Sequence, residues 1–368
     1  MVALELAEEM IRRGAKVHLL SNEIDGELKD RLIEIGATFT ENTADVDIFE
    51  FNLVWSQHHI LPHLLLNAIE GGRKPTAWPM FVFCHLSPYD PAEVPGPFIE
   101  RNIADMILAN SPETVEKLRE CGPPFDQAEV FPNPAPHDFS LARSKPKPEL
   151  ESLLVVSNHR NPEIKHALRK LARKGIRITR IGRRHSARRV TPQMIMDHDA
   201  VLTIGKTVQY ALRAGRPVFC YDRFGGPGWL NSVNFERAAW HNFSGRDKQT
   251  KRSSEALCSE VIEGYREARE FAVKLERQGL LPYALEHHLD QILRIAQSLR
   301  ETQSWYEERL ELFMEPSFAT MIRHETRIAE IYRKEFLHRR KAEAKKRYFR
   351  RFVSKLRRQG AKYFDNSF

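Results

Sequence analysis

The sequence of 368 residues has few cysteines and no long apolar run. Its cysteines, Cys84, Cys121, Cys220 and Cys258, are widely spaced and form no Cys-x-x-Cys pair. This spacing argues against a disulfide scaffold or a zinc ribbon and predicts reduced, structural thiols. No stretch of about 18 apolar residues and no signal-peptide pattern occurs, so we expect a soluble, cytoplasmic protein.

Positive charge is concentrated at the carboxyl end of the chain. Residues 333–368 contain fourteen Lys or Arg and three Asp or Glu, a net +11 against +8 for the whole chain, so the rest is mildly acidic. Tyr348, Phe349, Phe352, Val353 and Leu356 recur at helical spacing among these basic residues. The pattern predicts a basic amphipathic helix that suits an anionic membrane surface. RNA, an acidic protein or water would satisfy the same charges, and no specific nucleic acid is expected.

The most informative stretch is residues 199–230. The apolar run Ala200–Ile204 predicts a buried parallel strand, and Gly205-Lys206-Thr207 predicts a tight turn into a helix with Thr207 as its N-cap. A second buried strand, Pro217–Tyr221, leads into a predicted glycine loop at 225–228. Backbone N–H groups at a helix start suit a phosphate or diphosphate, and the Lys206 ammonium adds charge. Both turns should face one crevice at the carboxyl ends of the strands.

Several short motifs resemble nucleotide-binding or metal-binding patterns but have simpler explanations. A nucleotide-hydrolysing P-loop is disfavoured because Ala200 stands where that motif needs its first glycine, and an ordinary strand-turn-helix remains an alternative. His59 and His63 have the i, i+4 spacing of a zinc pair, but Pro62 lies between them and no further ligand is near, so His58 and His59 are more plausibly cleft residues. The Asp-x-Asp sequences at 45–47 and 197–199 each precede a strand, which indicates turn and cap residues. No metal site is predicted.

Strands and helices alternate along two halves of the chain. This alternation predicts an α/β fold with two Rossmann-like, doubly wound domains and a carboxyl-terminal basic helical extension. The expected boundaries are an amino-terminal domain at 1–143, a proline-punctuated linker at 144–150, a second domain at 151–300 and a helical tail at 301–368. A helix at Val2–Arg13 comes before the first strand, so the usual first strand and its loop are missing from the first domain.

The second half resembles the donor-binding domain of GT-B glycosyltransferases, particularly the retaining family-4-like group. The resemblance is carried by Ala211–Val218, which reads Ala-x-x-x-Gly-x-Pro-Val, and by the following Gly225-Gly226. In the first half, residues 107–114 and 130–134 resemble segments that close the acceptor domain. Tyr210 departs from the family, because a glutamate is usual at that position.

The resemblance implies a nucleotide-sugar pocket in the second domain and an acceptor site in the first. His85 would contact the transferred sugar or orient the acceptor hydroxyl, although a structural histidine is an equal alternative; Arg160 and Lys206 would hold the diphosphate. The remaining residues implied to bind the donor are Asn158, Gly205, Thr207, Gln209, Tyr210, Gly225 and Gly226.

The implied activity is sugar transfer to a glycan or glycolipid in cell-surface polysaccharide synthesis, with retention and without a metal or cofactor. A catalytically silent scaffold for a polysaccharide-assembly complex is the main alternative. An epimerase or hydrolase on the same architecture would need a set of cleft carboxylates and histidines that the sequence does not supply.

Overall fold

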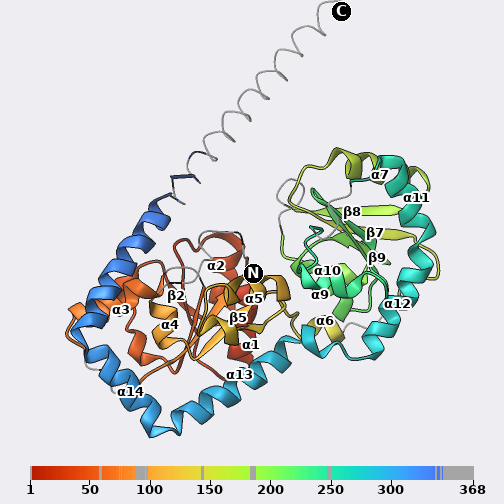
Figure 1. Ribbon diagram of the computed structural model, residues 1–368. Helices are drawn as coiled ribbons and strands as arrows, with labels where there is room; N and C mark the ends of the chain where they lie inside the picture. Colours follow the sequence, from red (N-terminus) through yellow and green to blue (C-terminus); the bar gives the residue numbers. More distant parts are fainter. Residues whose placement is uncertain are drawn as a thin grey trace, which may run out of the picture.

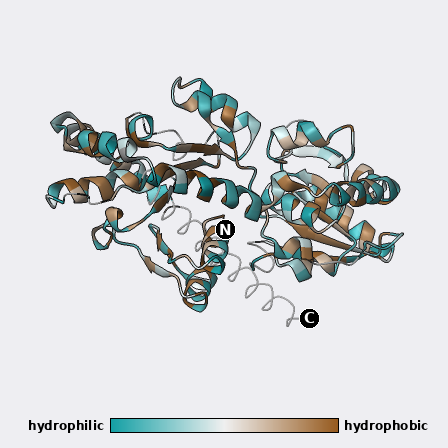
Figure 2. Ribbon diagram, turned by 90° about the horizontal axis from the view of Figure 1, so that it is seen from below, coloured by the Kyte–Doolittle hydropathy of each residue, from teal (hydrophilic) through white to brown (hydrophobic). Residues whose placement is uncertain are grey.

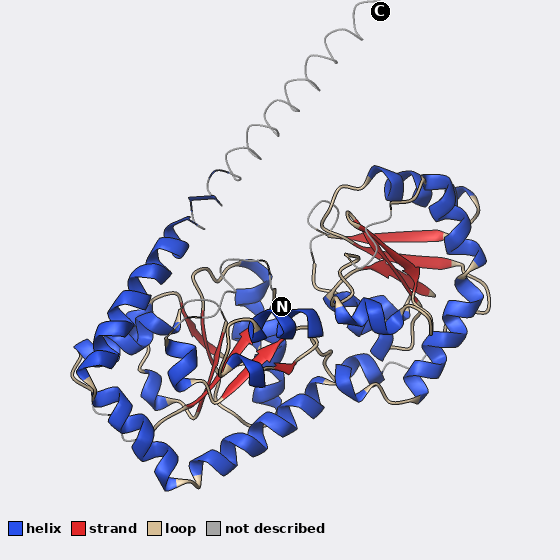
Figure 3. Cartoon of the chain, viewed as in Figure 1, coloured by secondary structure: helices blue, strands red, loops and turns tan. Residues whose placement is uncertain are grey.

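The chain forms two α/β domains that lie side by side (Figure 1, Figure 3). The computed structural model describes residues 2–57, 60–73, 75, 77–87, 89, 96, 98–141, 145–182, 188–246, 251–335, 338, 339 and 342. His58, His59 and nearly all of the basic segment after residue 335 lie outside the described residues.

The first domain has a parallel sheet in two parts. Its elements are α1 (Val2–Arg12), β1 (His18–Leu20), α2 (Gly26–Glu34), β2 (Thr38–Thr40), η1 (Thr43–Asp45), η2 (Ile48–Glu50), β3 (Leu53–Ser56), α3 (Leu61–Glu70), β4 (Met80–His85), α4 (Ile99–Ile103), β5 (Met106–Ala109), α5 (Pro112–Arg119), η4 (Phe125–Gln127) and β6 (Glu129–Val130). Strands β1 and β2 pair with each other, and a separate sheet has the order β3-β4-β5-β6. Helix α1 packs on both parts: Leu4 joins the core beside β1 and β2, whereas Leu6 joins Met80 and Val82 of β4.

The second domain is a doubly wound sheet. Its elements are α6 (Asp138–Leu141), β7 (Ser152–Val156), α7 (Pro162–Arg173), β8 (Arg177–Ile181), α8 (Pro192–Met196), β9 (Ala200–Thr203), α9 (Lys206–Arg213), β10 (Val218–Asp222), β11 (Gly225–Trp229), α10 (Phe235–Trp240), α11 (Ser254–Glu263) and α12 (Tyr265–Arg277). The strand order is β11-β10-β9-β7-β8. Leu154 and Val201 face the core under α9, whereas Leu153 and Leu202 face the core under α7 and α11, because successive residues of a strand point to opposite faces. Figure 2 shows the hydrophobic strands enclosed by helices with hydrophilic outer residues.

The last helices return to the first domain. After η5 (Leu281–Tyr283), helix α13 (Leu285–Arg300) packs against β4, and α14 (Gln303–Met314) is followed by a helix at residues 316–335. Phe313, Phe318 and Ile322 of these helices join the core around Trp78. In Figure 1 they run along the lower and outer edges of the first domain. The topology thus confirms two Rossmann-like domains with returning helices, the GT-B arrangement that the resemblance implies.

This packing corrects the predicted domain boundaries. Helix α6 belongs to the second domain because Phe139 lies in its core, so the first domain does not extend to residue 143. The second domain ends near Tyr283 and not at residue 300, because α13 packs on the first domain. The predicted tail at 301–368 is also wrong up to residue 335, since its apolar residues complete the first-domain core.

Three local predictions fail for identifiable reasons. The strand expected directly after the Asp-x-Asp sequence at 45–47 begins only at Leu53, because the Asp47 carboxylate accepts the Phe49 N–H at 3.1 Å and caps η2. Gly205, and not Thr207, is the N-cap of α9, with φ of 63° and no side chain. The predicted glycine loop at 225–228 is instead β11, an edge strand antiparallel to β10.

The returning helices should contribute substantially to first-domain stability. Phe318 is 0% exposed and its ring lies 5.7 Å from that of Phe98, so Phe318→Ala is expected to lower the free energy of unfolding by about 3–5 kcal/mol in chemical denaturation. Met321→Ala on the same helix, where the side chain is exposed, should change it by less than about 0.5 kcal/mol. Equal effects of the two substitutions would contradict this packing.

Candidate functional site

The predicted donor residues gather at the carboxyl edge of the second sheet. Ser157 follows β7, Gly205 follows β9 and Asp222 ends β10, and these three parallel strands are neighbours in the order β10-β9-β7. The Gly205 N–H donates to the Phe243 carbonyl at 2.9 Å. A Cβ atom on Gly245 would lie only 2.7 Å from the carbonyl oxygen of Gly225, so the two backbone segments are in close contact. Gly205 and Gly225 therefore both approach the segment 243–245.

Lys206 points from the start of α9 toward the first domain. Its Nζ lies 2.7 Å from Glu5 Oε2 of α1 and donates to the Pro134 carbonyl at 3.1 Å. Burial lowers the pKa of the Lys206 ammonium, and the facing Glu5 carboxylate opposes that shift. Lys206 thus lies between the domains, where a residue that binds a diphosphate is expected. Its positive charge, however, is already neutralised by the Glu5 carboxylate.

Tyr210 also takes part in the contact between the domains, whereas the neighbouring Gln209 bonds within the second domain. The Tyr210 hydroxyl donates to Glu5 Oε1, and its ring stacks on Phe139 with centroids 4.2 Å apart. Burial raises the pKa of this hydroxyl, so it stays a donor. Gln209 Nε2 donates to Asn242 Oδ1 at 3.2 Å. Both side chains are buried, and their role as donor contacts stays a prediction.

A buried carboxylate that the sequence analysis missed organises the loop after β7. Asp222, whose side chain is 3% exposed, accepts a hydrogen bond from Ser157 Oγ at 3.0 Å and lies 2.7 Å from His159 Nδ1. Because an ionised carboxylate only accepts hydrogen bonds, this contact requires a proton on Nδ1. The neighbouring Asn158 and Arg160, both predicted donor residues, are exposed at this rim. The available signal for this carboxylate was a polar residue at the end of β10, which only β9 separates from β7.

Two more ion pairs join the domains beside this rim. The two terminal nitrogens of Arg189, Nη1 and Nη2, donate to the two oxygens of the Glu8 carboxylate, each at 2.6 Å. Arg246 pairs with Glu113 of α5 at 2.5 Å, and its guanidinium lies 4.8 Å from the centre of the Tyr89 ring. The cations come from the second domain and the carboxylates from the first.

His85 lies at the end of β4, as predicted, but it is enclosed. Its side chain is 7% exposed, and Nε2 lies 2.9 Å from Glu100 Oε2. The other Glu100 oxygen accepts the Gly96 N–H at 2.8 Å. These contacts match the structural alternative for this histidine, and its predicted contact with the sugar stays untested.

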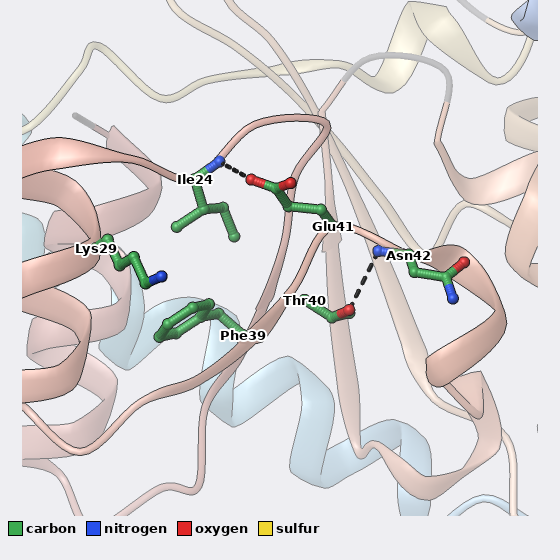
Figure 4. Close-up of a pocket in the computed structure, with 6 residues that line it drawn as sticks. All are labelled: Ile24, Lys29, Phe39, Thr40, Glu41 and Asn42. Atoms are coloured by element: carbon green, nitrogen blue, oxygen red, sulfur yellow. Dashed lines mark hydrogen bonds between the residues drawn. The ribbon is translucent and has the colours of Figure 1, made fainter.

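A separate pocket lies in the first domain, at the carboxyl end of β2. It has a volume of about 470 Å³ and is lined by Ile24, Lys29, Phe39, Thr40, Glu41 and Asn42 (Figure 4). Glu41 accepts the Ile24 N–H, which closes one wall (Figure 4). No predicted site residue lines this pocket. Among the described residues, no group of three or more His, Cys, Asp or Glu is arranged to hold a metal ion.

The described part of the chain also contains no helix that is both long and apolar enough to cross a lipid bilayer. By its fold, the chain is a two-domain α/β protein with the GT-B arrangement.

Comparison with known proteins gives only structural likenesses. No protein-family profile and no curated protein sequence matches the chain. The chain is similar to Anabaena HepE in complex with UDP and glucose, with a TM-score of 0.49 and 14% identity over 82% of this chain and 95% of that one. It is also similar to S. aureus MnaA with UDP, with a TM-score of 0.41 and 12% identity over 80% and 95%. At these values, what those proteins bind is not transferred to this chain.

A third similar structure is the apo form of WaaB, a lipopolysaccharide outer core galactosyltransferase. It has a TM-score of 0.36 and 12% identity over 75% of this chain and 95% of that one.

The Glu113–Arg246 contact predicts a pH-dependent stability. Although burial acts in the opposite direction, hydrogen bonds from Tyr89 and Arg246 hold the pKa of Glu113 below its ordinary 4.5. A carboxyl group whose pKa is lower in the folded state than in the unfolded state stabilises the fold at pH values above its unfolded pKa. This stabilisation is lost as the pH falls through the folded pKa. Glu113→Gln should therefore lower the free energy of unfolding at pH 7 by about 1–3 kcal/mol.

The difference between Glu113→Gln and the parent protein should shrink in denaturation measured at successively lower pH, as the pH falls below 4.5 and through the lowered pKa of Glu113 in the folded state. Glu116→Gln, an exposed position on the same helix, is the matched control and should change little at either pH. A constant difference across this pH range would show that the ion pair is not responsible.

Proposed function

We propose that the protein is a glycosyltransferase that moves a sugar from a nucleoside-diphosphate donor, held by the second domain, to an acceptor bound mainly by the first. The observation that carries this proposal is that the Gly205 turn and the first residue of β11, Gly225, both approach residues 243–245, next to a lysine that faces the other domain. Ligands of open α/β sheets bind at this carboxyl edge.

The chemistry requires stabilisation of a departing diphosphate. As the bond to the sugar breaks, negative charge develops on the phosphate oxygens, and Lys206, Arg160 and the start of α9 would offset it. His159, held by Asp222, lies at the same rim. We propose that the reaction needs neither a metal nor a bound cofactor, because these groups supply the positive charge.

The finer assignments rest on the family resemblance and on the basic carboxyl-terminal segment. They are hexosyl transfer with retention, a glycan or glycolipid acceptor, and a role in cell-surface polysaccharide synthesis. The protein would act in the cytoplasm at the inner face of the membrane, where residues 333–368 attract anionic lipids by about 1 kcal/mol per well-placed cation.

The second candidate is a catalytically silent scaffold for a polysaccharide-assembly complex. The pairing of Lys206 with Glu5 favours it, because that contact already satisfies the cation expected to bind the diphosphate. The burial of Tyr210 points the same way. The two candidates differ in one property: only the enzyme must bind a nucleotide in the crevice.

Thermal unfolding in the presence of a panel of nucleoside diphosphates separates the two candidates. A ligand at 100 times its Kd stabilises the folded state by about 2.7 kcal/mol and raises the Tm. This rise should vanish in Lys206→Ala, compared with the Tm of the same variant without ligand. Lys170→Ala, the control, removes an ion-paired lysine of α7 and should leave the ligand-induced rise in Tm unchanged. No response to any nucleotide would favour the scaffold.

The basic segment is tested separately by removing residues 336–368, which leaves the helix at 316–335 intact. Sedimentation with vesicles that contain anionic lipid should fall at least tenfold, because about 1 kcal/mol per cation is lost over several cations. Vesicles of neutral lipid are the control. Unchanged binding to anionic vesicles would rule out this role.

A further inference from the structure

The helix at residues 316–335 carries an exposed apolar stripe. Met321, Ile328 and Ile331 are 39%, 42% and 67% exposed. Because they are separated by seven and three residues, their side chains lie on one face of the helix. Apolar side chains that are exposed singly are normal on a protein surface, whereas a row of them on one face is typical of a contact surface.

The stripe is separate from the face that holds this helix on the first domain. Phe318, Ile322 and Ala329 are buried, and the first two join the core around Trp78. In Figure 1 the helix lies at the outer edge of the first domain, on the side away from the second domain. A partner that binds the stripe would therefore leave the contact between the domains uncovered.

The charge around the end of the stripe is mostly positive. Arg327 is exposed and comes four residues before Ile331, so the two side chains are neighbours on the helix surface. The charge of Glu330 is offset by Lys334, at 3.5 Å. Residues 333–368 then add a net charge of +11. Apolar side chains beside a cluster of cations are the combination that binds an anionic membrane surface.

The apolar face of the predicted basic amphipathic helix continues the stripe in sequence. Phe349 and Leu356 follow Ile328 by three and four complete seven-residue repeats. Seven residues make almost two turns, so a continuous helix keeps these positions on nearly the same face. Both residues lie outside the described part of the chain, and the continuity comes from sequence spacing. It indicates that the stripe and the basic segment contact one surface.

We propose that Met321, Ile328 and Ile331 form a membrane-contact surface of the first domain, which enters the interface of an anionic bilayer beside the basic segment. A second copy of the chain could also cover apolar residues at seven-residue spacing. However, it would bring together two segments of net charge +11, which repel each other, whereas anionic lipids attract them. This inference rests on the proposed function, which places the basic segment at the membrane, and adds a contact made by the folded domain.

The test is sedimentation of the full chain and of the double variant Ile328→Ser/Ile331→Ser with vesicles of equal parts phosphatidylcholine and phosphatidylserine. The double substitution removes apolar surface and keeps every charge. Ile33→Ser is the matched control, because Ile33 is 60% exposed on α2 of the same domain. All three positions are exposed, so each variant should keep the Tm of the parent protein, and an unchanged Tm establishes that it is folded.

The double variant should bind these vesicles at least about tenfold more weakly than the full chain, because apolar burial is lost at two positions. Ile33→Ser should bind like the full chain. At about 1 M salt, interactions between exposed charges are screened beyond about 3 Å. The binding that the full chain keeps at this salt concentration should therefore be lost in the double variant.

Three results would overturn the inference. Equal binding of the full chain and the double variant would assign the contact to the basic segment alone and leave the proposed function standing. A dimer of the full chain in analytical ultracentrifugation that the double variant does not form would assign the stripe to a second copy. Absence of binding of the full chain to these vesicles would refute the proposed membrane location together with this inference.

Discussion

The contact of Glu5 with Lys206 and Tyr210 is the interaction on which the crevice depends. A carboxylate that is 2% exposed has lost its water, and the loss must be offset by partners in fixed positions. These partners come from α9 of the other domain, so the contact fixes where the start of that helix lies. Breaking such a pair by removing one partner leaves an uncompensated buried charge, which makes it a strong positional constraint.

The chain connections between the domains also constrain the crevice. Ala135 and Ala284 lie on the two crossing segments and pair as a short parallel bridge, with the Ala135 N–H donating to the Tyr283 carbonyl at 2.9 Å. The two crossing segments therefore run side by side where the chain passes between the domains.

The sequence predicts the fold well because its buried strands are short apolar runs in regular alternation with helices. Ala200–Thr203 and Val218–Asp222 needed only local information. The three-residue strand Thr38–Thr40 was missed, since it has no apolar run. β11 was taken for a loop because its glycines favour turns, whereas its pairing with β10 is a tertiary contact.

The sequence predicts the location of the candidate site but not its charge balance. The Gly205 turn and Lys206 were recognised from their spacing, and the turn follows β9 as predicted, whereas the predicted glycine loop is the strand β11. Glu5 lies 201 positions before Lys206, on a helix of the other domain, so no local pattern could pair them. Asp222 and His159 were overlooked for the same reason, because they meet only when the strands β7 and β10 are set in their sheet order.

The return of the final helices to the first domain sets an order of events during synthesis. The second domain is one continuous stretch, from α6 to η5, and can complete its core as soon as that stretch has left the ribosome. The first domain is made earlier, yet Phe318 and Ile322 must arrive before its core is closed. Its contacts span most of the chain and form slowly, so the half synthesised first is finished last.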